Sequence, residues 1–140
     1  MAFTGNFSCN TLRSCLINGS FDFSTDTFYM ALYTNNASLD QTTTAYTSVG
    51  EVVATGYSPG GELVTATVNT TETSSGSVTY VNFSSPSWTA ALTARGALIY
   101  TPGSDGAVCV LDFGSNKTST TSFTVQMPAN TSTSALIRIV

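Results

Sequence analysis

The sequence contains no histidine, and only 9% of its residues are charged. Histidine is the commonest general base and the commonest metal ligand near neutral pH, so its absence removes the main side chain of acid–base and zinc chemistry. Four lysines and arginines in total are too few for the cationic patch that binding to phosphate groups needs. We therefore expect no enzymatic activity, no cofactor, no metal ion and no nucleic acid, and a function carried by a surface.

Cysteine is scarce and odd in number, with Cys9, Cys15 and Cys109. An odd set without a CxxC pair argues against a disulfide framework and against a zinc site. Cys109 lies in an apolar run at 108–111 and is expected to pack as a small hydrophobic residue. Whether Cys9 or Cys15 bonds to another molecule stays open at the level of the sequence.

Long apolar runs are also missing. The first residues lack the basic and apolar regions of a signal peptide, and no later stretch is apolar for long enough to cross a bilayer. We expect the chain to be made in a cytoplasm and to have no membrane partner. Its 140 residues, 41% of them hydrophobic, suit one domain at 1–140 with a core of its own.

Serine and threonine make up about a third of the chain and are interleaved with β-branched and aromatic residues. Short stretches of this kind alternate with turn residues. They span 27–33, 51–53, 63–68, 78–83, 92–100, 107–113, 122–127 and 135–140. Seven or eight short strands at this spacing predict an all-β fold, an antiparallel β-sandwich or barrel, and we favour the sandwich.

One short helix is expected near the N-terminus, capped by Asn10 or Thr11 and ended by Gly19. Its apolar face would consist of Leu12, Cys15 and Leu16. A helix of about two turns is stable only when it is docked on something larger. It is therefore either a lid over one end of the core, which we favour, or a peg for a partner with Leu12 and Arg13 in contact.

Motifs with a chemical meaning are few. The Asp-Phe-Gly triplet at 112–114 spells the magnesium-binding motif of protein kinases, but the other kinase motifs are missing. Asp22 and Asp26 could share a calcium ion, yet they lack the ordered series of ligands that calcium loops have. Glu51 and Glu62 carry no signal of a glycosidase pair. We assign no catalytic and no metal-binding residue.

The strongest turn signal is Pro-Gly-Ser-Asp at 102–105, which predicts a hairpin between residues 92 and 113. A reversal between Gly103 and Ser104 gives the pairs Tyr100 with Ala107, Leu98 with Cys109, and Arg95 with Asp112. One face would then carry Leu98, Tyr100, Cys109, Leu111 and Phe113, and the other Ile99, Val108 and Val110. Both faces are apolar, which predicts a place in the middle of a sheet, with Arg95 and Asp112 as a structural pair that fixes the register.

Five segments of the chain occur in the same order in a known family. They are DTFYMALYT at 26–34, GEVVATGYSPGG at 50–61, TARGALIY at 93–100, VLDFG at 110–114 and FTVQ at 123–126. With the Met-Ala-Phe start and the short helix after it, they resemble a family of small structural proteins of tailed bacteriophages over nearly the whole chain. The resemblance implies a β-sandwich subunit of the virus particle, in the first place a decoration or cement protein of the phage head. Family members carry lysines in the first helix, where this chain has only Arg13.

Under this interpretation the chain is made in the cytoplasm of the bacterial host and binds the outside of the head. Its partners are the major capsid protein and further copies of itself, with a trimer as one option. The alternative is a tail, fibre or adhesion module that binds carbohydrate through Tyr57, Trp88 and the threonine-rich loops, although a lone tryptophan in a β-domain is more often part of the core. The candidate partner contacts are Leu12, Arg13, Tyr57 and Trp88.

Overall fold

The structure is a computed structural model that describes residues 3–139; Met1, Ala2 and Val140, the last residue of the final expected strand, lie outside it. It confirms an all-β fold with one short helix near the N-terminus. The elements are β1 (Phe7–Ser8), α1 (Asn10–Ile17), β2 (Phe28–Tyr33), β3 (Glu62–Val64), β4 (Ala66–Thr73), β5 (Gly76–Phe83), β6 (Ser87–Trp88), β7 (Thr93–Tyr100), β8 (Ala107–Thr118), β9 (Phe123–Thr124) and β10 (Ile137–Ile139). The strand count within 3–139 exceeds the expected seven or eight, because β1 and β6 were not predicted and the expected strand at 63–68 divides into β3 and β4. The strand expected at 51–53 was wrong, since the structure has only an isolated bridge between Tyr33 and Glu51 there.

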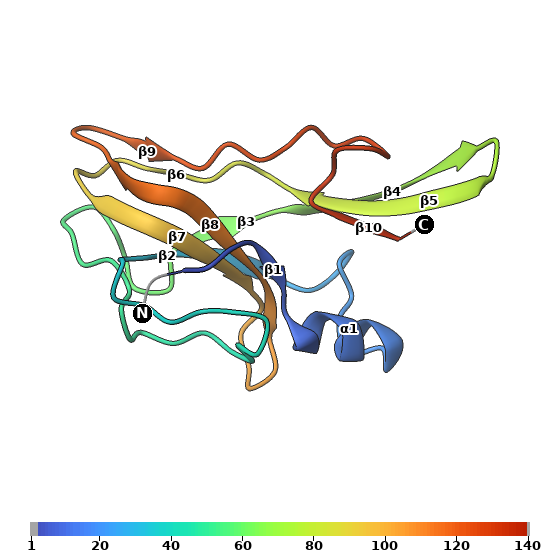
Figure 1. Cartoon of the computed structure of the whole chain (residues 1–140), viewed down its shortest axis with the longest axis horizontal. Coiled ribbons are helices and arrows are strands. Elements are labelled where there is room, and N and C mark those ends of the chain that lie inside the picture. Colours follow the sequence, from blue (N-terminus) through green and yellow to red (C-terminus); the bar gives the residue numbers. More distant parts are fainter. Residues whose placement is uncertain (1–2, 140) are drawn as a thin grey trace.

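The strands form two layers, with antiparallel pairing throughout the described ladders (Figure 1). One layer is a five-stranded sheet in the order β1-β8-β7-β2-β3. The other consists of a three-stranded sheet, β10-β5-β4, and the short pair β6-β9. Fully buried Phe28, Trp88 and Ile99 belong to the large hydrophobic cluster between the layers. The β4–β5 hairpin extends beyond this core as an arm at one end of the molecule.

The five-stranded sheet is also covered on its second face. Tyr33, Leu98 and Val110 are fully buried in a second cluster, together with Ala37 and Leu39 from the loop that follows β2. Strands that are covered on both faces read as nearly continuous hydrophobic runs. This explains the apolar sequences of β2 and β7, and it confirms the central place that was predicted for the strand at 92–100.

The register of the β7–β8 hairpin agrees with the prediction only next to the turn. Tyr100 pairs with Ala107 as expected, but Leu98 pairs with Val110 and not with Cys109. Val108 is an extra residue at a bulge, and its carbonyl oxygen accepts a hydrogen bond from the Cys9 amide at 2.9 Å. A shift of one residue moves side chains to the other face, so the predicted grouping of Leu98 with Cys109 was wrong.

Arg95 and Asp112 form an ion pair, with side chains only 14% and 12% exposed, but they are not directly opposite. Asp112 pairs with Gly96, and Arg95 lies at a second irregularity of the ladder. The Asp112 carboxylate also accepts a hydrogen bond from the Gly114 amide at 2.8 Å, where the backbone has φ +82°. The prediction of a directly opposed pair was wrong because β8 bulges here. The ion pair holds this bulge in place.

Helix α1 lies over the end of the five-stranded sheet. Its N-cap residue is Cys9, which makes no side-chain capping bond, so the predicted caps Asn10 and Thr11 were wrong. The Thr11 hydroxyl instead donates to the Ala107 carbonyl at 2.6 Å and ties the helix to the start of β8. Leu12 and Cys15 are buried, whereas Ile17 is 90% exposed. The packing matches a lid over the core.

Candidate functional site

The structure brings a carboxylate and several tyrosines together around Glu51, which is only 8% exposed. One carboxylate oxygen accepts hydrogen bonds from the Tyr57 hydroxyl and the Gly60 amide, both at 2.7 Å. The other accepts from the Tyr46 hydroxyl at 2.5 Å. A buried charge needs such donors, because it has lost its hydration. We call Glu51, Tyr33, Tyr46, Tyr57 and Tyr100 the Glu51 cluster.

The Glu51 cluster connects the irregular segment 46–61 to the five-stranded sheet. The Tyr57 hydroxyl accepts a hydrogen bond from the Leu32 amide at 2.8 Å, in the middle of β2. The Tyr100 hydroxyl, at the end of β7, donates to the Gly60 carbonyl at 2.7 Å, and the Tyr33 hydroxyl donates to the Thr47 carbonyl at 2.7 Å. Each polar atom therefore has a structural partner. This arrangement stabilises a loop and leaves no carboxylate oxygen directed at a substrate.

The tyrosines of the cluster are held in their neutral form. Burial, followed by the negative charge of Glu51, raises the pKa of Tyr100 to about 12. Burial is also the largest cause that raises the pKa values of Tyr33, Tyr46 and Tyr57, and Glu51 adds to it in all three. Neutral hydroxyls can donate to the carboxylate, whereas phenolates would repel it.

These raised pKa values predict a loss of stability at alkaline pH. Tyr33 and Tyr57 ionise near pH 10 when unfolded and above that when folded, so their contribution is complete below pH 10 and is lost as the pH rises above it. Burial also raises the pKa of the Cys9 thiol from 9.0 to about 11. The free energy of unfolding should therefore begin to fall near pH 9, where this thiol ionises in the unfolded chain. Each group that ionises only in the unfolded chain removes about 1.4 kcal/mol per pH unit.

Thermal unfolding measured from pH 7 to pH 11.5 should show a flat Tm up to about pH 9 and a steep fall beyond pH 10. Tyr33→Phe should lower the Tm at pH 7, because the hydrogen bond from the Tyr33 hydroxyl to Thr47 is lost. It should also make the Tm fall less steeply above pH 10, because the variant has one ionising group fewer. An equal Tm at pH 8 and pH 11 would contradict the prediction.

Three of the four candidate contact residues are buried. Leu12, Tyr57 and Trp88 are 3%, 7% and 1% exposed, so as partner contacts they are corrected to core residues. The Trp88 ring packs against Tyr57 and Phe123, with ring centroids 5.9 and 6.4 Å apart. Only Arg13 is exposed, and its guanidinium donates to the side chains of Asn10 and Ser8.

The weak metal and disulfide hypotheses find no support in the described part of the chain. The Asp26 carboxylate accepts from the Asp22 amide at 2.9 Å, and the Asp22 carboxylate accepts from the Ser24 amide at 2.9 Å, so both carboxylates serve a local turn. No group of three potential metal ligands occurs within residues 3–139. Cys9, Cys15 and Cys109 are free and buried, so Cys9 and Cys15 are not accessible for a bond to another molecule. No helix in the described residues is long and apolar enough to span a membrane.

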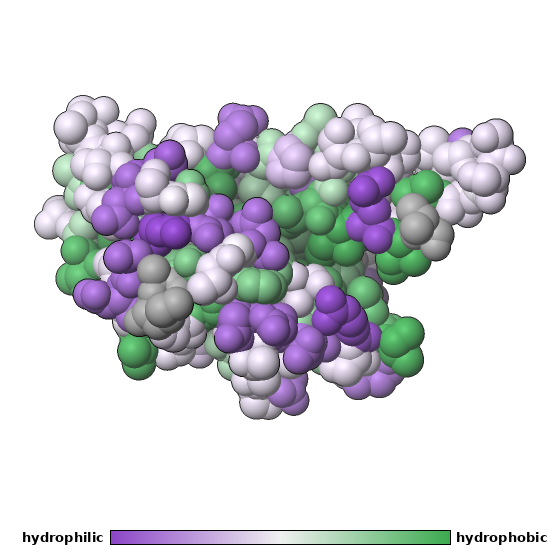
Figure 2. All heavy atoms as spheres, viewed as in Figure 1, coloured by the Kyte–Doolittle hydropathy of each residue, from purple (hydrophilic) through white to green (hydrophobic). Residues whose placement is uncertain are grey.

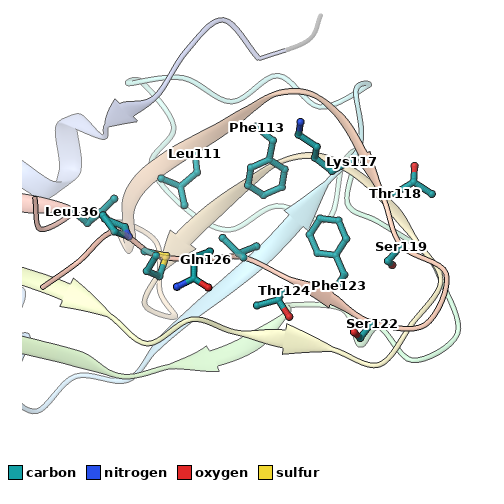
Figure 3. A pocket seen from close by; sticks show the side chains of 13 residues that line it. Leu111, Phe113, Lys117, Thr118, Ser119, Ser122, Phe123, Thr124, Gln126 and Leu136 are labelled. Carbon is teal, nitrogen blue, oxygen red and sulfur yellow. The ribbon is translucent and has the colours of Figure 1, made fainter.

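A cleft of 570 Å³ lies between the layers on the side of β8 and β9 (Figure 3). Phe113 from β8 and Phe123 from β9 face each other there, with ring centroids 6.1 Å apart. Leu111, Met127 and Leu136 continue the apolar lining, and Lys117 lies at the rim. The lining is mostly apolar and hydroxyl-bearing, with Lys117 as its one charged group.

The most exposed part of the fold is the arm formed by β4 and β5. All of β4 except Ala66 is exposed, and the arm surface in Figure 2 is mostly pale, as expected for serine and threonine. Apolar side chains lie in the hollow between the arm and α1, where a groove of 380 Å³ is lined by Leu16, Val68 and Ile139. The arm is therefore the candidate interaction surface.

Sequence reasoning missed both the Glu51 cluster and the arm. The sequence contains one usable signal for the cluster, the glycine-rich segment 56–61 that includes Tyr57. This signal was not sufficient, because the tyrosines of the cluster come from distant segments. The signal for the arm is clearer, since residues 65–73 form a threonine-rich stretch without proline or lysine.

Comparison of the chain with family models, with curated proteins and with solved structures finds no match.

Proposed function

We propose that the chain is a structural subunit of a virus particle, a decoration or cement protein on the outside of a tailed-phage head. Two lines support the proposal. The first is the resemblance of five segments to phage structural proteins. The second is the contrast between the enclosed Glu51 cluster, whose carboxylate is fully hydrogen-bonded, and the long exposed arm. This contrast is the observation that carries the proposal, because it favours a contact surface over a catalytic site.

A cement protein needs only contact area that is repeated in many copies. Each copy can contribute a modest interface with the major capsid protein, because the effective concentration of neighbouring sites on a shell multiplies weak contacts. A rigid two-layer core suits this task. The sparse charge avoids strong long-range attraction to polyanions such as the packaged DNA.

A carbohydrate-binding module of the tail or fibre is the second candidate, and the packing disfavours it. Such modules stack sugars on exposed aromatic rings. Tyr57 and Trp88, the two residues suggested for this role, are 7% and 1% exposed. A tail or fibre position without sugar binding remains the alternative that the experiment must separate from decoration.

The experiment uses the phage that encodes this chain. Quantitative mass spectrometry of purified particles should give hundreds of copies, spread over the head in electron cryomicroscopy. Particles assembled without the chain should release their DNA at a lower temperature and under milder osmotic shock. Re-addition of the purified chain should restore the release temperature, which serves as the control for indirect effects of the deletion.

Two results would overturn the head assignment. One is a handful of copies at a single vertex. The other is unchanged DNA retention combined with lost adsorption to cells, which would assign the chain to the tail or fibre. A chain absent from purified particles would refute a virion role altogether.

A further inference from the structure

The outer edge of β4 is an unprotected sheet edge. β4 is the terminal strand of the order β10-β5-β4 and pairs with β5 along its whole length, from Ala66 with Phe83 to Thr73 with Gly76. Natural edges of this length are usually blocked by lysine, proline or a bulge, because they otherwise template pairing with another strand. Residues 66–73 contain none of these, and Glu72 is their only charge.

The pairing of β4 with β5 defines which backbone groups of β4 point away from the sheet. The Thr65 carbonyl points toward β5, because it accepts a hydrogen bond from the Ser84 amide at 2.9 Å. Backbone groups alternate along an antiparallel strand, so odd residues of β4 point toward β5 and even residues point away. The outward set is Ala66, Val68, Thr70 and Glu72. No other described segment forms a hydrogen bond with the backbone of these four residues.

We propose that two copies of the chain associate through this edge, with their β4 strands antiparallel about a two-fold axis at Asn69. This register places Ala66 opposite Glu72 of the second copy and Val68 opposite Thr70 of the second copy. It uses every outward backbone group of β4 and forms about eight hydrogen bonds between the copies. The two three-stranded sheets become one continuous sheet in the order β10-β5-β4-β4-β5-β10.

Charge and side-chain pattern favour a second copy in this orientation. In the antiparallel register the two Glu72 carboxylates lie at opposite ends of the interface, about 20 Å apart, whereas a parallel register would place like charges side by side. Val68, 44% exposed in one copy, would pack against Thr70 and, diagonally, Val68 of the second copy. It would also extend the apolar strip that Val68 forms with Val81 and Ile137 across the sheet.

The shape of the molecule permits this association. The arm projects beyond the rest of the fold (Figure 1), so the two-layer cores lie away from the axis. A two-fold interface of this kind is self-complementary and closed, and it gives a dimer without further growth at the same edge. The inference goes beyond the proposed function and does not depend on it, because it concerns the purified chain in solution.

Cross-linking tests the register directly. Asn69 faces its own counterpart across the axis, in a pair whose Cα atoms are about 4.5 Å apart and suit a disulfide. Asn69→Cys should therefore form a covalent dimer under mild oxidation. Thr71→Cys is the matched control, because it faces Thr67 of the second copy and lies about 13 Å from its counterpart. The unchanged chain is the negative control for cross-linking, because its three native cysteines are buried.

Sedimentation velocity over a range of concentrations tests the association itself. The unchanged chain should be dimeric, and Val68→Lys should weaken the dimer at least tenfold, because it places cations beside the axis. Val53→Lys is the control for a surface valine, since Val53 is 97% exposed and lies outside the arm. It should leave the dimer unchanged.

A chain that stays monomeric up to about 1 mM, or equal cross-linking of the Asn69→Cys and Thr71→Cys variants, would overturn the proposal. So would a monomeric chain whose binding to phage heads is abolished by Val68→Lys, which would assign the β4 edge to a capsid partner. Dimerisation of a chain that is absent from virus particles would uphold this inference while the proposed function fails.

Discussion

Replacing Gly61 with alanine is expected to destabilise the fold by about 2 to 5 kcal/mol. The residue has φ +83°, which costs a side-chain-bearing residue about 1 to 2 kcal/mol. A Cβ at this position would also overlap the Met30 carbonyl oxygen and crowd the Ala31 backbone, and such overpacking costs about 1 to 3 kcal/mol more. The loop that supplies Gly60 to the Glu51 cluster would have to move away from β2. Urea unfolding would measure the loss.

Gly19 provides the matched control. It has φ +78°, almost the same as Gly61, but a Cβ there would meet nothing within 4 Å. Gly19→Ala should therefore cost only the conformational term, about 1 to 2 kcal/mol. Equal losses for the two variants would show that the contact with β2 is not what makes Gly61 necessary.

Removing the buried carboxylate with Glu51→Ala is expected to cost about 2 to 6 kcal/mol. The substitution leaves the Tyr57 hydroxyl and the Gly60 amide without their acceptor, and each unsatisfied buried donor costs about 1 to 3 kcal/mol. Tyr46, which is half-buried, can bond to water instead. Single domains typically have a total stability of only about 5 to 15 kcal/mol, so the variant should lose a large part of it. Guanidinium denaturation followed by tryptophan fluorescence would report it, since Trp88 packs against Tyr57.

Two variants separate hydrogen bonding from charge and from a general effect of losing a glutamate. Glu51→Gln keeps one carbonyl acceptor and should cost about 1 to 2 kcal/mol. Glu62→Ala removes the exposed carboxylate of β3 and should change stability by less than about 0.5 kcal/mol. A loss for Glu51→Ala as small as that for Glu62→Ala would contradict a structural role of the Glu51 cluster.

The β7–β8 hairpin shows where sequence reasoning succeeds and where it stops. The turn at 102–105 correctly places Tyr100 opposite Ala107, because turn chemistry is local. One residue further, the bulge at Val108 shifts the register, at the point where Cys9 from the start of the chain donates a hydrogen bond to the Val108 carbonyl. A period-two pattern cannot reveal such a shift when both faces of a strand are apolar.

The same distinction applies to single residues. The burial of Tyr57 was not predictable from the sequence, because it depends on contacts of its hydroxyl with Leu32 and Glu51 from other segments. Trp88 followed the general tendency of a lone tryptophan to pack in the core.

By itself the sequence determined the all-β class, the single short helix and the central place of the strand at 92–100. These depend on composition and on periodicity, which neighbouring residues express together. Only the tertiary structure decided the register beyond the turn, the burial of Glu51 among tyrosines and the free edge of β4. Each of these depends on which distant segments meet, and a strand edge is free only when no other part of the fold covers it.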